Sequence, residues 1–132
     1  MPKYSERSEN ALKTAHPDLQ RLFREVIKTF DHVIIEGHRN KTDQDKAVES
    51  GHSKTRWPNS KHNSTPSNAV DAIPYPVNWK DTKRICYFAG YVKAIAIMMD
   101  IPLRWGGDWD NDTDLNDQTF FDLVHFELSP KI

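Results

Sequence analysis

The sequence has little of what secreted, membrane-spanning or nucleic-acid-binding proteins need. A single cysteine, Cys86, excludes an internal disulfide. There is no run of about 18 apolar residues, so we expect neither a membrane-spanning helix nor stable membrane association. The formal net charge of −1 provides no basic field to attract nucleic acid. The first residues lack an apolar signal region, which predicts a protein made and kept in a reducing cytosol.

Length and apolar periodicity predict one α+β domain over residues 1–132. Apolar residues from Leu19 to Phe30 recur at helical spacing, which predicts a helix over 18–30. The same reasoning gives helices over about 5–15, 42–50 and 79–100, strands near 32–36, 69–73, 102–106 and 123–128, and a long polar loop over 51–68. Helices beside short strands indicate a small antiparallel sheet with helices packed on one face.

Three residues far apart in the chain, His62, Asp71 and His125, supply the donor types of a catalytic zinc site. Such a site takes three protein ligands and leaves one position open for water. Two neutral imidazoles and one carboxylate leave the ion positively charged, which lowers the pKa of bound water toward about 7. Asp122 is a candidate to accept the proton. The other four histidines are interpreted as structural or surface groups: His16, His32, His38 and His52.

Asp71 lies inside a short strand that is otherwise small and apolar. Regular alternation places it on the face opposite Val70 and Ala72. A buried carboxylate requires a cation or hydrogen-bond donors. The sequence therefore predicts a charged partner for Asp71 on that face of the sheet.

The last predicted strand also alternates, with His125 and Glu127 on the face away from Val124 and Phe126. Asp122 stands at an odd offset from His125 and would point to the opposite face of a regular strand. It can share the site only if the chain bends or bulges just before His125.

These motifs together resemble a known family. A Ser-x-His loop ending at His62, an Ala-x-Asp strand ending at Asp71 and a late Asp-x-x-His ending at His125 resemble zinc peptidases that cut bacterial cell-wall peptides. That family includes D-alanyl-D-alanine carboxypeptidases and L-alanyl-D-glutamate endopeptidases, and the chain is most similar to compact phage endolysins. The resemblance implies that these three residues are the zinc ligands and that Asp122 is the general base.

Two further residues acquire roles through this resemblance. Arg39 follows a strand end, as the family's arginine does, and could hold a substrate carboxylate or stabilise the oxyanion; a surface salt bridge is the alternative. Ser60 matches the family's serine and could bind substrate or orient His62, or simply cap the loop. The segment 103–109 resembles the endolysins' strand and glycine turn. The loop before Asp71 is longer than the shortest family form.

The resemblance implies zinc-dependent hydrolysis of the L-alanyl-D-glutamate bond in the peptidoglycan stem peptide. Cleavage of D-alanyl-D-alanine ends is the alternative within the family. A non-catalytic zinc-containing binding module is the alternative of another class, and Asp122 argues against it because a binding module needs no general base. We expect a monomer that stays in the host bacterial cytoplasm until another factor releases it to the periplasm and cell wall.

The acidic run over 108–117 invites a calcium interpretation, because carboxylates alternate at 108, 110, 112 and 114. It lacks the glycine of the EF-hand turn, where Thr113 stands, and the closing glutamate. We therefore expect weak calcium binding at most, with a solvated loop as the alternative. Trp57, Trp105 and Trp109 are candidates to line a substrate groove, although Trp105 fits the core equally well.

Overall fold

The computed structural model describes residues 2–129 and confirms the α+β class. Its helices and strands are α1 (Glu6–Leu12), α2 (Pro17–Val26), β1 (His32–Glu36), α3 (Lys41–Glu49), β2 (Ala69–Pro74), α4 (Thr82–Met98), β3 (Leu103–Gly106) and β4 (Asp122–Leu128). The strands pair in the order β1-β2-β4-β3, and every pairing is antiparallel. No helix of the described residues has the length and apolarity to cross a membrane.

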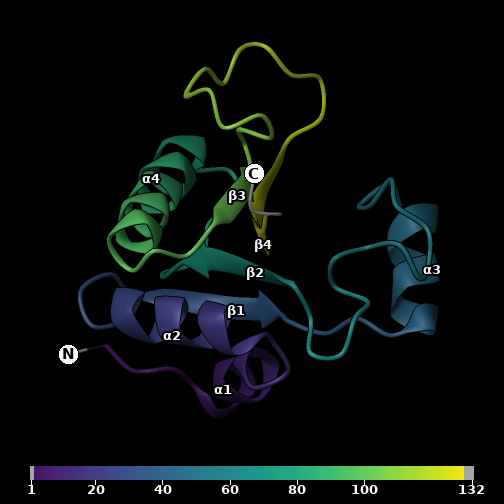
Figure 1. The fold of residues 1–132 in the computed structure, drawn as a ribbon, viewed down its shortest axis with the longest axis horizontal. Helices are drawn as coiled ribbons and strands as arrows, with labels where there is room; N and C mark the ends of the chain where they lie inside the picture. The colour runs from purple at the N-terminus through teal and green to yellow at the C-terminus, as the bar shows by residue number, and fades with distance from the viewer. Residues whose placement is uncertain (1, 130–132) are drawn as a thin grey trace.

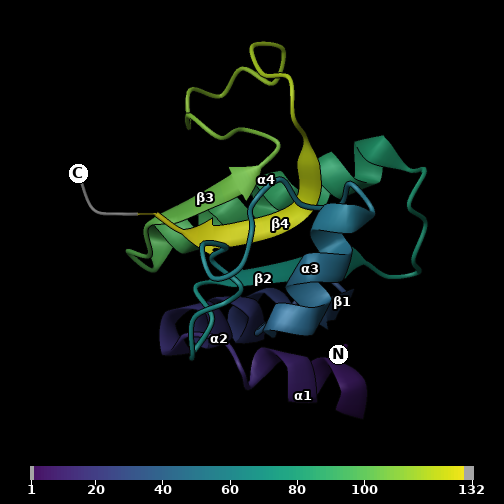
Figure 2. The same cartoon turned by 90° about the vertical axis from the view of Figure 1, so that its right-hand side faces the viewer.

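The two sides of the sheet differ in what covers them. Helices α1, α2 and α4 bury the main apolar core against one face (Figure 1). Helix α3 and the loop that follows it lie over the opposite face, in front of the sheet when the molecule is turned (Figure 2). Residues 51–68 between α3 and β2 form no helix, as predicted for a long polar loop. The polar face of the sheet is therefore opposed by a loop.

Side-chain alternation follows the predicted pattern. Val70, Ala72 and Phe126 belong to the main core, whereas Asp71 and His125 point to the other face. Asp71 and His125 are direct cross-strand partners in the β2–β4 pairing. Because side chains that are opposite across a ladder lie close together, this register brings the two residues to one place.

Three helices are shorter than predicted. Helix α1 ends at Leu12 rather than near residue 15. Helix α2 ends at Val26 rather than at residue 30, because the apolar Phe30 serves tertiary packing instead: its ring makes an edge contact with Phe88 at 5.0 Å. Helix α4 begins at Thr82 rather than at residue 79, because the Asp81 side chain accepts a hydrogen bond from the Arg84 amide and caps the helix.

The β3–β4 pairing is irregular where the chain approaches the site. Trp105 pairs with Phe126, but the next residue, Gly106, pairs with Asp122. A Cβ atom at Gly106 would lie 2.1 Å from the Asp122 carbonyl oxygen, so only glycine permits this close approach. The bend that Asp122 needs in order to share a face with His125 is therefore present.

His32, at the start of β1, is 2 % exposed and is packed among aromatic rings. Its Nδ1 donates to the Phe30 carbonyl at 2.8 Å, and its Nε2 lies 2.5 Å from the Tyr4 hydroxyl. Burial lowers the pKa of His32 from 6.5 to about 4, because the charged ring would lose its hydration.

We predict that His32 makes folding stability depend on pH. Between pH 6.5 and 4 the unfolded chain binds a proton at His32 that the folded chain does not, so stability is lost as pH falls through this window. At about 1.4 kcal/mol per tenfold change in proton affinity, the loss is about 3 kcal/mol. Urea unfolding from pH 7 to 4 should show a shallower pH dependence in His32→Gln than in the unsubstituted protein. Equal slopes would contradict the assignment, whatever the loss at pH 7.

Candidate active site

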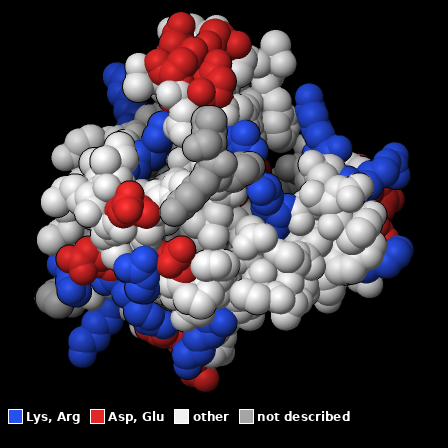
Figure 3. Space-filling view, in the orientation of Figure 1, with Lys and Arg blue, Asp and Glu red and all other residues white. Residues whose placement is uncertain are grey.

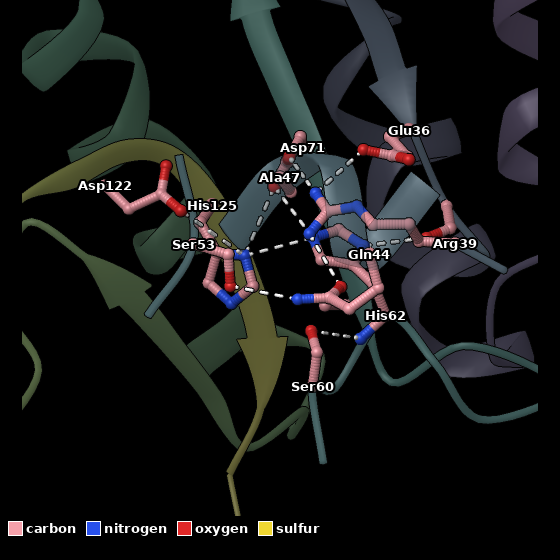
Figure 4. Close-up of polar contacts among 12 residues, drawn as sticks. Glu36, Arg39, Gln44, Ala47, Ser53, Ser60, His62, Asp71, Asp122 and His125 are labelled. Carbon is pink, nitrogen blue, oxygen red and sulfur yellow. Dashed lines mark hydrogen bonds and ion pairs between the residues drawn. The ribbon is translucent and has the colours of Figure 1, made fainter. Parts of the chain in front are cut away.

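Three atoms from three separate segments meet on the polar face of the sheet. His62 Nε2 lies 3.1 Å from Asp71 Oδ1 and 3.2 Å from His125 Nδ1, and the latter two atoms are 3.2 Å apart (Figure 4). All three side chains are buried. The predicted candidates thus form a nearly equilateral triangle of potential ligand atoms.

The other nitrogen of each ring shows where the ring proton lies. His62 Nδ1 is 2.7 Å from the Gly37 carbonyl oxygen, and His125 Nε2 is 2.8 Å from Glu127 Oε1. Because a carbonyl and a carboxylate only accept hydrogen bonds, these two nitrogens carry the protons. In the neutral rings, the lone pairs of His62 Nε2 and His125 Nδ1 therefore face Asp71 Oδ1, and three acceptors converge on one point. Such an arrangement requires a cation.

The spacing of these atoms suits a tetrahedral metal ion. Zinc bonds nitrogen and carboxylate oxygen at about 2.0–2.2 Å, which separates neighbouring tetrahedral ligands by about 3.3 Å. The observed separations of 3.1 to 3.2 Å are close to this value. The three residues therefore fit a metal ion of this kind.

Electrostatics in the site favour an ionised carboxylate beside a cation. Burial alone would raise the pKa of Asp71, but positive charge on a protonated His62 and the hydrogen bond from a protonated His125 hold this pKa far below its usual range. Burial would lower the pKa of His125, yet its hydrogen bonds to Asp71 and Glu127 raise it to about 10, so a proton on this ring meets the need for a cation when no metal is bound. Asp71 is thus negative in the folded protein, and the site around it attracts positive charge.

Asp122 reaches the same site from the bend in β4. Its Oδ2 lies 4.0 Å from His125 Nδ1. Asp122 lines the cavity that opens beside the three potential ligand atoms, which we call the cleft. Burial and the nearby Asp71 carboxylate raise the pKa of Asp122 above its usual value. A carboxylate with increased proton affinity beside a metal position is suited to accept and return a proton.

Arg39 is buried beside the ligands rather than exposed on the surface. It donates to Glu36 Oε2 at 2.8 Å and to Gln44 Oε1 at 3.0 Å, and it lies 3.5 Å from Asp71 Oδ2. The guanidinium nitrogen Nη2 thus contacts the carboxylates of both Glu36 and Asp71. The surface salt bridge considered from the sequence is therefore wrong.

Ser60 lies in the loop that carries His62. Its hydroxyl accepts a hydrogen bond from the His62 amide at 3.2 Å, which is the loop cap considered from the sequence, and the residue also lines the cleft. The loop before Asp71, which is longer than the shortest family form, is anchored at Ser67. The backbone of Ser67 forms hydrogen bonds with Thr14 and His16.

Sequence reasoning missed Gln44, which is completely buried although it belongs to the outlying helix α3. Its oxygen accepts from Arg39 and from Asn63 Nδ2, and its nitrogen donates to Ser53 Oγ and the Thr55 carbonyl. A glutamine in a polar helix gives no sequence signal of burial. Its role depends on contacts with residues distant in the chain.

Most of the remaining histidines have structural or surface positions. His32 belongs to the aromatic core, His16 accepts a backbone hydrogen bond at the start of α2, and His38 contacts a loop carbonyl. His52 differs because it lines the cleft.

A cavity of about 330 Å³ opens beside the ligand triangle, between the polar face of the sheet and the loop after α3. Its walls include four Lys and Arg residues and two acidic residues: Arg39, Lys54, Lys61, Arg104, Asp122 and Glu127. Trp109 and Phe120 form a stacked pair on one side, with ring centroids 6.2 Å apart. This cavity is the cleft that Asp122, Ser60 and His52 also line.

The three candidate tryptophans have different positions. Trp109 lines the cleft, as expected. Trp105 is 3 % exposed and belongs to the main core, which was its alternative. Trp57 lines a separate cavity beside α3, so its assignment to the groove is wrong.

The acidic run forms an irregular loop in which oxygens of Asp108, Asp110 and Asp112 lie within 4.8 Å of one another. Acidic side chains gather at this end of the molecule (Figure 3). Asp108 is buried and already accepts from Lys93 Nζ at 3.3 Å and from the Thr113 amide at 3.0 Å. Weak calcium binding at most remains a prediction for this loop.

Comparison with known proteins agrees with the fold. The sequence model of the phage L-alanyl-D-glutamate peptidase family matches residues 1–129. The L-alanyl-D-glutamate peptidase of Escherichia phage T5 is 27% identical, over 96% of this chain and 97% of the relative. The crystal structure of the Serratia marcescens L-Ala D-Glu endopeptidase ChiX is 28% identical, with a TM-score of 0.74 over 96% of this chain and 90% of that chain. The chain belongs to the phage L-alanyl-D-glutamate peptidase family.

Proposed function

We propose that this protein is a zinc peptidase that hydrolyses the L-alanyl-D-glutamate bond of the peptidoglycan stem peptide during lysis of the bacterial wall. The observation that carries the proposal is the convergence of three potential ligand atoms, on His62, Asp71 and His125, beside the carboxylate of Asp122. Family membership and the names of the relatives support the choice of bond.

The residues around the cleft divide the work of hydrolysis. When bound, zinc supplies a Lewis acid that polarises the scissile carbonyl and lowers the pKa of water. Asp122 takes the proton of the attacking water and returns one to the leaving amine, a contribution of typically 10²- to 10⁴-fold. Arg39 and Ser60 line the cleft, where Arg39 is proposed to stabilise the oxyanion or a substrate carboxylate and Ser60 to bind substrate.

The charge of the cleft supports an acidic substrate. The chain has a formal net charge of −1, yet Lys54, Lys61 and Arg104 all line this one cavity. In Figure 3, basic side chains lie beside the hollow between the region of helix α3 and the rest of the molecule. Because Arg104 pairs with Glu127, the two lysines supply the positive charge that attracts and orients an anionic peptide.

We expect purified peptidoglycan to be cut at one bond in a metal-dependent manner. Digestion should yield new glutamate amino termini by mass spectrometry, and a chelator should abolish the reaction until zinc is restored. Release of D-alanine would support the carboxypeptidase alternative. Lysis that is unchanged after complete metal removal would contradict the proposal.

The role of Asp122 is tested with Asp122→Asn, which keeps the shape of the side chain and removes its basicity. It should bind zinc like the unsubstituted protein and lose about 10²- to 10⁴-fold in kcat. A variant that retains zinc and full activity would exclude Asp122 as the base.

Gly106→Ala should displace Asp122 without removing any functional group. The added Cβ would meet the Asp122 carbonyl oxygen at 2.1 Å, so the bend in β4 must move. A displacement of about 1 Å near the reacting atoms can cost about 10²-fold in rate. The matched control is Gly90→Ala in α4, where the added methyl meets nothing within 4 Å and activity should be unchanged. Full activity of Gly106→Ala would contradict the close-approach argument.

We predict that Lys54→Gln combined with Lys61→Gln weakens the recognition of a free substrate carboxylate. At up to about 1 kcal/mol for each exposed charge, kcat/KM should fall about 3- to 10-fold for a stem peptide with a free glutamate carboxylate. The loss should be smaller for the same peptide amidated at that position. Lys28→Gln, in the exposed turn after α2, is the control and should change neither value. An equal loss on both peptides would show that the lysines do not read this carboxylate.

A further inference from the structure

Glu127 has a buried carboxylate beside the three proposed metal ligands. It is neither one of these ligands nor the proposed general base. It is 5 % exposed, its Oε1 accepts from His125 Nε2 at 2.8 Å, and its Oε2 accepts from Arg104 at 2.7 and 3.2 Å. Both contacts follow from strand geometry. His125 and Glu127 lie two residues apart on one face of β4, and Arg104 is the direct cross-strand partner of Glu127 in β3.

The contact with Glu127 determines which nitrogen of His125 is free. A neutral imidazole has one N–H and one lone pair, and a carboxylate accepts only from the N–H. With Nε2–H bound to Glu127, the lone pair of His125 must be on Nδ1, which faces Asp71 Oδ1 and His62 Nε2. The opposite tautomer would place a proton on Nδ1, among the ligand atoms.

His62 is oriented differently. Its Nδ1 donates to the Gly37 backbone carbonyl, an acceptor whose position is set by the chain and which carries no charge. His125 depends on a side chain, and a side chain must itself be held in place. Arg104 does this with two hydrogen bonds to one oxygen of Glu127, which leaves Oε1 for His125.

We propose that Glu127, held by Arg104, is a positioning residue that selects the His125 tautomer with Nδ1 free for the metal. The inference rests on the proposed zinc function. Hydrogen bonds from carboxylates to ligating imidazoles typically change metal affinity 10- to 100-fold when they are removed. The alternative is a structural ion pair between Glu127 and Arg104 that only joins β3 to β4.

Glu127→Gln separates the two roles, because an amide has one accepting and one donating end. Arg104 donates only, so it will take the amide oxygen and turn the NH₂ group toward His125. That group must then meet a lone pair on Nε2, which forces the proton onto Nδ1. We expect zinc affinity, measured by competition with a chromogenic chelator, to fall 10- to 100-fold.

The double variant Arg104→Met with Glu127→Gln should regain most of this loss. Without Arg104, the amide is free to turn its oxygen toward His125 Nε2 and restore the original tautomer. Long-range ¹⁵N–¹H NMR of the zinc-loaded proteins reports which ring nitrogen carries the proton. A second substitution that restores affinity is not expected if the pair only stabilises the fold, because removing both partners then leaves the strands less well joined.

Glu9→Gln is the matched control, because Glu9 makes a comparable two-bond contact with Arg24 on the surface, away from the cleft. It should leave the zinc dissociation constant unchanged. If folded Glu127→Gln binds zinc like the unsubstituted protein, or if the double variant binds no better than the single one, the tautomer role is wrong. If the unsubstituted protein binds no zinc, the proposed function itself fails, so the two failures are distinguishable. Should Glu127→Gln not fold, Arg104→Met alone decides, with the proposal requiring weaker zinc binding at unchanged helical content by circular dichroism.

Discussion

The rest of the site depends on the burial of one carboxylate. Asp71 is 4 % exposed in the second strand, and an isolated charge there would cost several kcal/mol. Its Oδ1 faces the lone pairs of His62 and His125, and its Oδ2 lies 3.5 Å from Arg39. One oxygen is thus directed to a cation that must be supplied, and the other is compensated by a resident guanidinium. Each oxygen of the buried carboxylate thus faces either a positive charge or the position for one.

The antiparallel sheet converts this requirement into geometry. The β2–β4 register places Asp71 opposite His125, and the β3–β4 register places Arg104 opposite Glu127. Because the two pairs lie two residues apart on β4, they are successive rungs on one face. The pair that holds the proposed ligands and the pair that supports them therefore share strand β4, and a slip of one residue in β4 would turn both toward the core.

The sequence predicted this sheet well because alternation is a local signal. Asp71 and His125 are on the predicted face, and the bend needed by Asp122 is present next to Gly106. The ends of α2 and α4 were wrong, since apolar periodicity does not distinguish a helical turn from a loop that packs against the core. Gln44 was missed entirely, because its burial comes from a loop that returns to α3. Contacts between segments distant in sequence leave no periodic signal in either segment.

His62 is the one proposed ligand outside the sheet, and hydrogen bonds fix it to the end of a strand. Its carbonyl accepts from the Arg39 amide at 2.8 Å, and its ring Nδ1 donates to the Gly37 carbonyl at 2.7 Å. Both contacts are to the segment directly after β1, so the ligand is referenced to the end of a strand rather than to its own loop. Gln44 then ties the loop to α3 with hydrogen bonds whose loss would leave buried groups unpaired, at about 1–3 kcal/mol each. A long loop can thus supply a metal ligand because the ligand itself is bonded to the sheet side of the cleft.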